Sequence, residues 1–415
     1  MPLNLHAPSR RELLLASGVL FAWAHLPKAA RAQGRDPRLL VIVLRGALDG
    51  LATVAPVGDP DWIKLRGDKA LTPEGPTAAL ELDGFFALNP AMPNLHRLYR
   101  AGQAAFVHAC ATSYRERSHF DGQDVLESGL ERPGAVDTGW LNRALAALEP
   151  AGRAERGRRE AFAVGPVTPL VARGPAPVLS WTPPRLPPTS DDTIQRVAEL
   201  YRHTDPALAR ALEERMGLAA IARAGGMENR PAKPPAGGAA QVLAFFAESA
   251  GAAAKFLARP DGPRIGALAY DGWDTHQDEG AVGGRLAALL GALDGAIAAI
   301  ETGTGAAWRE TAVAIVTEFG RTARINGTDG TDHGIATLAL LAGGAVKGGR
   351  VLADWPGLGD ANLYEGRDLA PTTDLRAVLK GVLKDHLRLD EKALASGVFP
   401  GSRLVRPMPG LNASA

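Results

Sequence analysis

The sequence has a single cysteine and no excess of charge of either sign, and each of these features excludes some classes of site or partner. Cys110 is the only cysteine in 415 residues, so an internal disulfide and thiolate-rich zinc or iron–sulfur sites are excluded. The 46 Lys and Arg residues balance 45 Asp and Glu residues, so nothing indicates nucleic acid or an acidic membrane surface as a partner. Beyond residue 32 we expect no apolar run long enough to span a membrane. Any metal would have to bind His, Asp, Glu or hydroxyl groups.

The first 32 residues have the layout of a secretory signal. A Ser-Arg-Arg-x-Leu-Leu pattern begins at Ser9, and an apolar stretch follows at 13–26. Ala30 and Ala32 then supply a small-x-small cleavage site. The paired arginines are typical of the twin-arginine route, so we predict a signal peptide over 1–32 and a periplasmic or secreted mature protein. An uncleaved membrane anchor is the alternative, but the apolar core is short for a bilayer span.

The remaining chain, 33–415, is expected to form one α/β domain. Apolar runs typical of buried strands occur at 39–44, 104–109, 265–270, 312–317 and 337–342. Apolar stripes with helical spacing lie between them and near the C-terminus, for example from Leu286 to Ile300. This alternation predicts a three-layer sandwich with a mostly parallel central sheet. A proline-rich and helical insertion is expected at about 165–240, with its helix near 191–224.

Acidic and histidine side chains occur where these strands begin or end. They are Asp49, Asp274, His276, Glu318 and His333. Sites in parallel sheets gather at the carboxyl ends of the strands, and residues two apart on an extended segment, such as Asp274 and His276, point the same way. With His333 they would form a three-ligand set with an open position, while Asp49 and Glu318 would form a second, carboxylate-rich site. We therefore predict one or two divalent cations, with zinc among the candidates.

A polar loop at 113–121 supplies the candidate nucleophile, Ser118. A serine beside a metal or an arginine ionises more readily and can attack an ester. Ser113 and His119 remain alternatives, and Ser118 could instead cap the helix that follows it. Arginines that could hold an anionic substrate are Arg45, Arg117 and Arg321.

Each predicted metal ligand also has a purely structural explanation. The Asp-x-His pair at 274–276 could be a loop feature, and Glu318 could form an ion pair with Arg321. Asp332 could cap a helix. The joint pattern favours a metal site, because separate strand ends each present an acid or a histidine.

As a set, these motifs resemble the DUF1501 family of exported bacterial proteins. The motifs are LRGALDG at 44–50, SHFDGQD at 118–124, GWDTH at 272–276, EFGRT at 318–322, GTDHG at 330–334 and GGAVKGG at 343–349. The similarity covers nearly the whole mature chain. That family is in turn similar to the alkaline phosphatase superfamily, which includes sulfatases and phosphoglycerate mutases. The resemblance therefore implies an alkaline phosphatase-like fold.

The resemblance also implies roles for individual residues. Asp49 resembles the first-strand metal ligand of the superfamily, Asp274 and His276 resemble an Asp/His pair on one metal, and His333 resembles its last histidine ligand. The nucleophile position falls at Ser118 or at the histidine that follows it.

Two departures from the superfamily limit this reading. Glu318-Phe319 stands where the superfamily usually has Asp-His, which removes one ligand. The sulfatase Cys/Ser-x-Pro-x-Arg motif is absent, which argues against formylglycine chemistry. We expect an exported metal-dependent hydrolase or transferase that acts on small anionic phosphate or sulfate esters. The alternative is a non-catalytic secreted binding or assembly protein that keeps the fold.

Overall fold

The computed structural model describes residues 35–134, 136–148, 161–165, 167–181 and 238–413, together with Tyr201 and Arg210. The residues from Pro37 to Ser414 belong to one compact unit. The predicted signal peptide and the predicted helix near 191–224 fall outside the described residues, apart from Tyr201 and Arg210.

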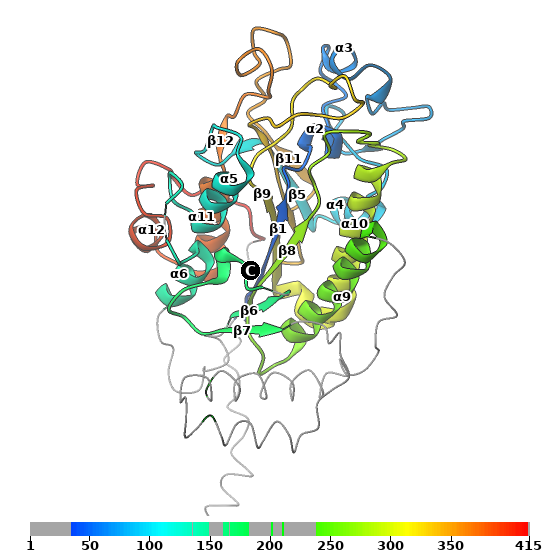
Figure 1. The fold of residues 1–415 in the computed structure, drawn as a ribbon. Helices are drawn as coiled ribbons and strands as arrows, with labels where there is room; N and C mark the ends of the chain where they lie inside the picture. Colours follow the sequence, from blue (N-terminus) through cyan, green and yellow to red (C-terminus); the bar gives the residue numbers. More distant parts are fainter. Residues whose placement is uncertain are drawn as a thin grey trace, which may run out of the picture. The chain divides into compact units, whose positions relative to one another are not determined.

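A large sheet forms the centre of this unit (Figure 1). Its strands are β1 (Arg38–Arg45), β5 (Ala104–Ala111), β6 (Ala161–Val164), β7 (Val178–Trp181), β8 (Ile265–Asp271), β9 (Thr311–Thr317), β10 (Thr337–Ala342), β11 (Arg350–Leu352) and β12 (Thr373–Asp374). They are ordered β11-β5-β10-β9-β1-β8-β6-β7, with β12 also beside β5. All of these pairings are parallel except those of β10, which is antiparallel to both β5 and β9. The five predicted strands all lie in this sheet, so the mostly parallel architecture is confirmed.

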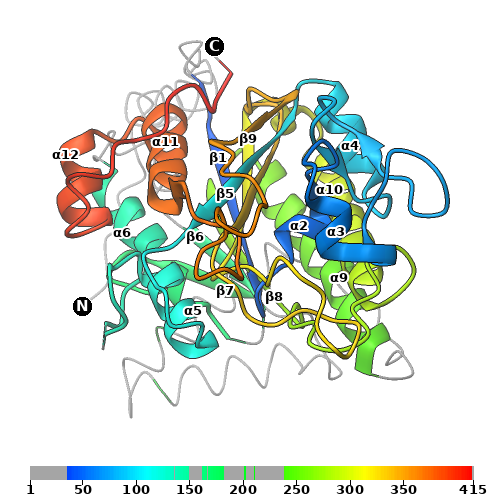
Figure 2. The ribbon, with the colours of Figure 1, turned by 90° about the horizontal axis from the view of Figure 1, so that it is seen from above.

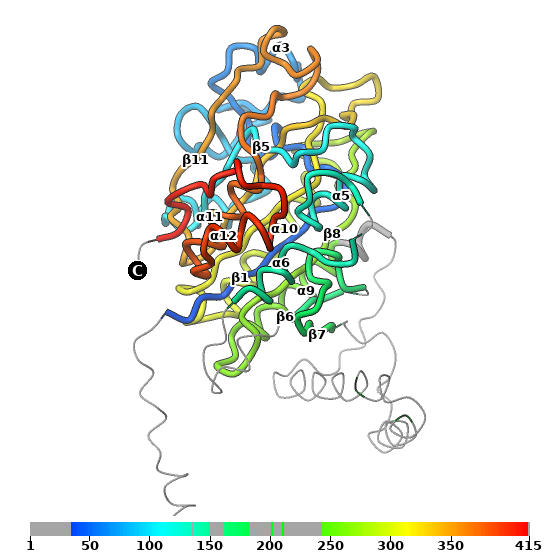
Figure 3. The backbone as a smooth tube through the Cα atoms, turned by 90° about the vertical axis from the view of Figure 1, so that its left-hand side faces the viewer, coloured from blue at the N-terminus to red at the C-terminus, as the bar shows by residue number. Residues whose placement is uncertain are grey.

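Helices cover both faces of the sheet, as Figures 1 and 2 show. One face carries α4 (Pro93–Arg100), α9 (Gly238–Ala258) and α10 (Arg285–Thr304). The other carries α5 (His119–Ser128), α6 (Trp140–Ala147), α11 (Leu375–Leu387) and α12 (Glu391–Ala393), of which α6, α11 and α12 face the viewer in Figure 3. Successive residues of a strand point to opposite faces, so Leu40 and Ile42 of β1 pack into one core while Leu39 and Val41 pack into the other.

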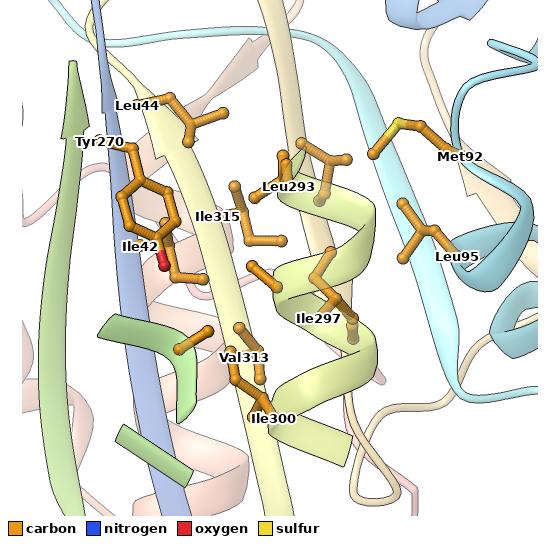
Figure 4. Packing of buried hydrophobic residues seen from close by; sticks show 14 of the residues in the cluster. Ile42, Leu44, Met92, Leu95, Tyr270, Leu293, Ile297, Ile300, Val313 and Ile315 are labelled. Carbon is orange, nitrogen blue, oxygen red and sulfur yellow. The ribbon is translucent and has the colours of Figure 1, made fainter. Parts of the chain in front are cut away.

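Helix α10 carries a long apolar stripe. Residues Arg285–Glu310 have the length and mean hydropathy, 1.4, of a membrane span, so the expectation that no such run follows residue 32 was too broad. In the structure Leu293, Ile297 and Ile300 pack in the same buried cluster as residues of β1 and β9 (Figure 4). Burying a side chain of this size contributes about 1.5–3 kcal/mol, which explains the apolar composition of a core helix.

The remaining elements are short. They are a small antiparallel sheet of β2 (Val54–Ala55), β4 (Ala87–Leu88) and β3 (Leu80–Glu81), the helices α2 (Gly50–Thr53) and α3 (Trp62–Arg66), and the turns of helix η1 (Gly67–Lys69), η3 (Leu170–Ala172), η4 (Gly305–Glu310) and η5 (Leu394–Val398).

The direction of β10 decides where the site lies. Leu44 near the end of β1 pairs with Tyr270 and Thr317, near the ends of β8 and β9. Because β10 runs the other way, its first residue, Thr337, pairs with Cys110 near the end of β5. The carboxyl ends of four strands and the start of β10 therefore meet at one edge. This is the upper edge in Figure 1, where α2 follows β1 and α5 follows β5.

Candidate metal centre

Three histidines surround the carboxylate of Asp274 at this edge. The Nε2 atom of His119 lies 3.4 Å from one Asp274 oxygen, and those of His276 and His333 lie 3.1 Å and 3.5 Å from the other. The His276 and His333 Nε2 atoms are 3.0 Å apart. Two ligands of a tetrahedral zinc ion, each about 2.0–2.1 Å from the metal, would be about 3.3 Å apart. These spacings therefore fit the ligands of one first-row divalent cation.

The four candidate ligands come from three separate parts of the chain. His119 is the first residue of α5, after β5. Asp274 and His276 follow β8, as predicted from their spacing. His333 precedes β10 and pairs through its backbone with Arg321, in the segment after β9. Among the described residues, one group offers three ligand atoms all within 4.8 Å of one another, and it consists of His119, Asp274 and His333.

The second nitrogen of each histidine faces an acceptor. The acceptors are Glu318 for His119 at 2.9 Å, the Arg117 carbonyl for His333 at 2.9 Å, and Asp332 for His276 at 3.3 Å. A hydrogen bond donated by Nδ1 fixes the tautomer and leaves a lone pair on Nε2. Three lone pairs and a carboxylate then face one another, and the buried Nε2 of His119 has no hydrogen-bond partner. A cation among the four groups would provide a partner for each of these atoms, so the residues fit a metal ion.

The buried Glu318 carboxylate supports the centre from behind His119. Besides His119, it accepts hydrogen bonds from the Gly46 amide (2.8 Å), the Gln123 amide (3.1 Å) and the Thr317 hydroxyl (3.0 Å). Burial alone would raise the pKa of Glu318, but the hydrogen bond from His119 and its other donors hold the pKa below its ordinary value. The same bond raises the pKa of His119. Glu318 is therefore an ionised orienting group with no oxygen turned to a second metal.

Arg321 fixes the position of Asp274. Its Nη1 donates to Asp274 at 2.7 Å, and its other nitrogens donate to the hydroxyl and the carbonyl of Thr331. Burial would raise the pKa of Asp274, yet Arg321 holds the pKa below its usual range. Burial lowers the pKa of His333. These shifts favour the Asp274 carboxylate and the neutral imidazole of His333, which are the forms that bind metal.

Asp49, a predicted metal ligand, is engaged elsewhere. Its carboxylate accepts both terminal nitrogens of Arg66, at 2.6 Å and 3.2 Å, and the amide of Ala52 at 3.0 Å, so it caps α2. Burial would raise its pKa, but Arg66 lowers it. With Asp49 bound to Arg66 and Glu318 bound to His119, the predicted second, carboxylate-rich site is not formed by the described residues.

The structure separates the three candidate nucleophiles. Ser118 occupies the N-cap position of α5, but its side chain makes no capping hydrogen bond; its amide donates to the Tyr114 hydroxyl at 3.2 Å. The Ser113 hydroxyl donates to the Glu131 carbonyl at 2.6 Å. His119 lies in the metal cluster. Sequence reasoning considered His119 only as a nucleophile, although its place beside Ser118, at the start of a helix that follows a buried strand, could have marked it as a ligand.

The candidate anion-binding arginines all form ion pairs. Arg45 lies 2.5 Å from Glu127, Arg321 binds Asp274, and Arg117 lies 2.7 Å from Asp368 and 2.6 Å from Glu365. Each guanidinium therefore already has a carboxylate partner.

Comparison with known proteins assigns the family. The chain belongs to the DUF1501 family, described as a protein of unknown function, whose model matches residues 36–398. The resemblance inferred from the motifs is thus confirmed. A search of curated proteins finds no match.

Several solved structures are similar to the chain. Ps i-CgsB, in complex with k-i-k-neocarrahexaose, has a TM-score of 0.43 and 11% identity, over 90% of this chain and 76% of its own. The PsFucS1 sulfatase from Pseudoalteromonas sp. has a TM-score of 0.35 and 12% identity, over 83% and 68%. The phosphonate monoester hydrolase of Agrobacterium radiobacter has a TM-score of 0.34 and 13% identity, over 85% and 74%. At these scores the likenesses support no inference about chemistry.

Proposed function

We propose that this protein is an exported metal-dependent hydrolase or transferase that acts on phosphate or sulfate esters. The observation that carries the proposal is the cluster of three histidine Nε2 atoms around Asp274, each with its Nδ1 atom held by an acceptor. The cluster lies where the carboxyl ends of the strands meet, which is the usual place for a site in an open α/β sheet.

The donor set favours one kind of cation. Imidazole nitrogen suits zinc and other first-row transition metals, whereas Mg²⁺ and Ca²⁺ select oxygen ligands. Such an ion, when bound, would polarise an ester oxygen and lower the pKa of a coordinated hydroxyl. The four ligands would be His119, Asp274, His276 and His333, with Glu318, Asp332 and Arg321 orienting them.

Ser118 is the proposed nucleophile. It adjoins the ligand His119, and its hydroxyl does not serve as a helix cap. The residue before it, Arg117, has a φ of 61°, in a region that non-glycine residues rarely adopt and that is common at functional sites. With the candidate arginines already paired, the bound cation would supply the main positive charge for an anionic substrate.

The test uses the full chain purified after export. Elemental analysis should find zinc or another first-row metal, and aryl phosphate or aryl sulfate esters should be hydrolysed. Ser118→Ala should keep the metal and lose turnover, whereas the matched Ser113→Ala should keep both. Protein that binds no transition metal, or Ser118→Ala protein with full turnover, would overturn this assignment.

A binding or assembly protein is the second candidate, and one observation favours it. The three arginines expected to hold an anion are all paired with carboxylates, so each is already engaged without a substrate. Metal-loaded protein that hydrolyses neither class of ester would favour this reading.

Export by the twin-arginine route is proposed from Arg10 and Arg11. Replacing both with lysine should leave the precursor in the cytoplasm, because the transport pathway reads the arginine pair. Normal export of the doubly substituted chain would refute the route.

A further inference from the structure

A tight turn, Tyr364–Asp368, contacts Arg117 and the backbone of His333 beside the candidate metal centre. Reciprocal backbone hydrogen bonds between Tyr364 and Asp368, at 2.8 Å and 3.0 Å, close the turn. Glu365 and Gly366 at its tip have φ values of 54° and 66°. Asp368 and Thr322 also form a backbone bridge, which attaches the turn to the segment after β9. The turn is therefore anchored at its base.

Two side chains of this turn reach groups next to the ligands. The Asp368 carboxylate accepts Nε and Nη2 of Arg117, at 3.0 Å and 2.7 Å. Arg367 donates to the backbone carbonyl of His333. Asp368 is fully buried, whereas Glu365, which also contacts Arg117, is 56% exposed. The two carboxylates thus share one partner in very different surroundings.

Arg117 connects this turn to a ligand. Its backbone has a φ of 61°, which costs a non-glycine residue about 1–3 kcal/mol and persists only when its surroundings hold it. In this conformation its carbonyl accepts a hydrogen bond from His333 Nδ1 at 2.9 Å. The His333 Nε2 atom then faces Asp274 at 3.5 Å.

We propose that Asp368 is a positioning residue for the metal centre, because it holds Arg117 in the conformation whose carbonyl orients His333. The inference rests on the proposed function, since it assumes that His333 is a metal ligand. The Asp368 carboxylate binds the Arg117 guanidinium and thereby holds the Arg117 backbone at positive φ. In this conformation the Arg117 carbonyl binds Nδ1 of His333, which directs Nε2 of His333 toward the metal.

Asp368→Asn tests the proposal, with Glu365→Gln as the matched control. Both substitutions are isosteric and both remove a negative charge beside Arg117. Outer partners of metal-bound histidines typically control affinity by about ten- to a hundredfold, so Asp368→Asn should weaken zinc affinity by about that factor. Glu365→Gln should change it by about twofold or less, because exposed ion pairs contribute little. Affinities would be measured by chelator competition, and the ligand field by the visible absorption of the Co²⁺-loaded protein.

Arg117→Gly provides a second, independent variant. Glycine adopts positive φ without strain and keeps the carbonyl, but it removes the side chain that Asp368 holds. Zinc affinity should fall about as far as in Asp368→Asn, and the double variant should be no weaker than Arg117→Gly alone. Equal affinities for Asp368→Asn and Glu365→Gln, or additive losses in the double variant, would overturn the proposal.

The ¹⁵N spectrum of the metal-free protein separates this proposal from the proposed function. His333 should show an Nδ1-protonated tautomer in wild type and a mixture of tautomers in Asp368→Asn. If wild-type protein binds no metal but this change appears, the proposed function fails and Asp368 still positions His333. If wild type binds zinc and the tautomer does not change, the positioning role fails and the metal site stands.

Discussion

Two carboxylates at the same edge of the sheet, the buried Asp49 and the partly exposed Asp274, have different surroundings. Both follow strands and both bind an arginine. Arg66 occupies both oxygens of Asp49, and the Ala52 amide takes a further lone pair. Arg321 takes only one oxygen of Asp274, and three histidine nitrogens face the carboxylate. Arg66 thus covers both oxygens of Asp49, whereas the Asp274 oxygen that Arg321 leaves uncovered faces His119.

The two regions also differ in how their charge is compensated. Around Asp49, Arg66 also lies 3.8 Å from the buried Glu279, and the Thr275 and Thr331 hydroxyls donate to Glu279 at 2.9 Å and 3.3 Å. Every group there has a partner of the right kind. Around Asp274, by contrast, three imidazole Nε2 atoms lie within 3.5 Å of the carboxylate. The first arrangement is a structural ion-pair network, and the second fits a cation.

The largest effect should come from Asp49→Asn. Removing one charge of a buried pair typically costs about 3–5 kcal/mol, because the partner charge stays buried, and Arg66 would lose its main carboxylate. We expect a loss of this order in the free energy of unfolding, measured in urea, with zinc affinity unchanged. Loss of zinc binding by a folded Asp49→Asn protein would instead make Asp49 a ligand and abolish the distinction between the two regions.

His333→Ala should have the reverse effects of Asp49→Asn: a large loss of zinc affinity and a small loss of stability. It removes a direct ligand, so zinc affinity should fall by at least the roughly ten- to hundredfold that outer-shell losses cause. The metal-free protein should keep most of its stability, because the deleted ring is partly exposed. Chelator competition and urea unfolding of the same samples would measure both quantities. Undiminished zinc affinity would remove His333 from the site.

Gly46→Ala and Gly272→Ala test whether the backbone packed against Asp274 matters for metal binding. Both glycines have positive φ, 117° and 105°, so each substitution should cost about 1–3 kcal/mol in strain. A Cβ at Gly46 would lie 2.6 Å from the Asp274 amide nitrogen, whereas one at Gly272 meets nothing within 4 Å. Only Gly46→Ala should therefore also weaken zinc binding. Equal zinc affinities in the two folded variants would contradict a role for this contact.

The stability of the Asp49 region should also depend on pH. Burial, followed by the nearby Asp49 charge, raises the pKa of Glu279 to about 8. Because the folded-state pKa lies above the ordinary value of 4.5, the native state holds the proton more tightly. The resulting stability is fully present below about pH 4.5 and is lost as the pH rises through 8.

Glu279→Gln should remove this dependence. The stability difference between wild type and variant should fall with rising pH by at most about 1.4 kcal/mol per pH unit. Urea unfolding at several pH values, with chelator present in both samples, would measure it, because titration of the histidines is then common to both. Parallel stability curves from pH 5 to 9 would show that Glu279 is ionised in the native state.

Much of the fold could be predicted because buried strands appear in the sequence as short runs of apolar residues. Runs such as 39–44 and 312–317 are apolar on both faces, since helices cover both sides of the sheet. The direction of β10 could not be read in this way, because it depends on the pairing of Thr337 with Cys110. Hydropathy alone could not decide the place of α10, since a core helix and a membrane-spanning helix can have the same hydropathy.

Part of the candidate site could be predicted because its residues lie next to recognisable strands in the sequence. Asp274, His276 and His333 lie together, as their positions at strand ends suggested. The partner of Asp49 could not be foreseen, because Arg66 belongs to a different helix and only the folded chain brings them together. The same limit applied to Glu318, whose contact with His119 spans 199 residues.

The acceptors at the three Nδ1 atoms have a consequence for how the ion is acquired. Glu318, Asp332 and the Arg117 carbonyl belong to segments already fastened by the sheet and its loops, so the ligands are arranged before any ion arrives. Small zinc modules are unfolded without metal, but this chain should remain folded whether or not an ion is bound. The ion would then act by mass action on a finished fold, adding about 2.7 kcal/mol of stability at a free concentration of 100 times its Kd.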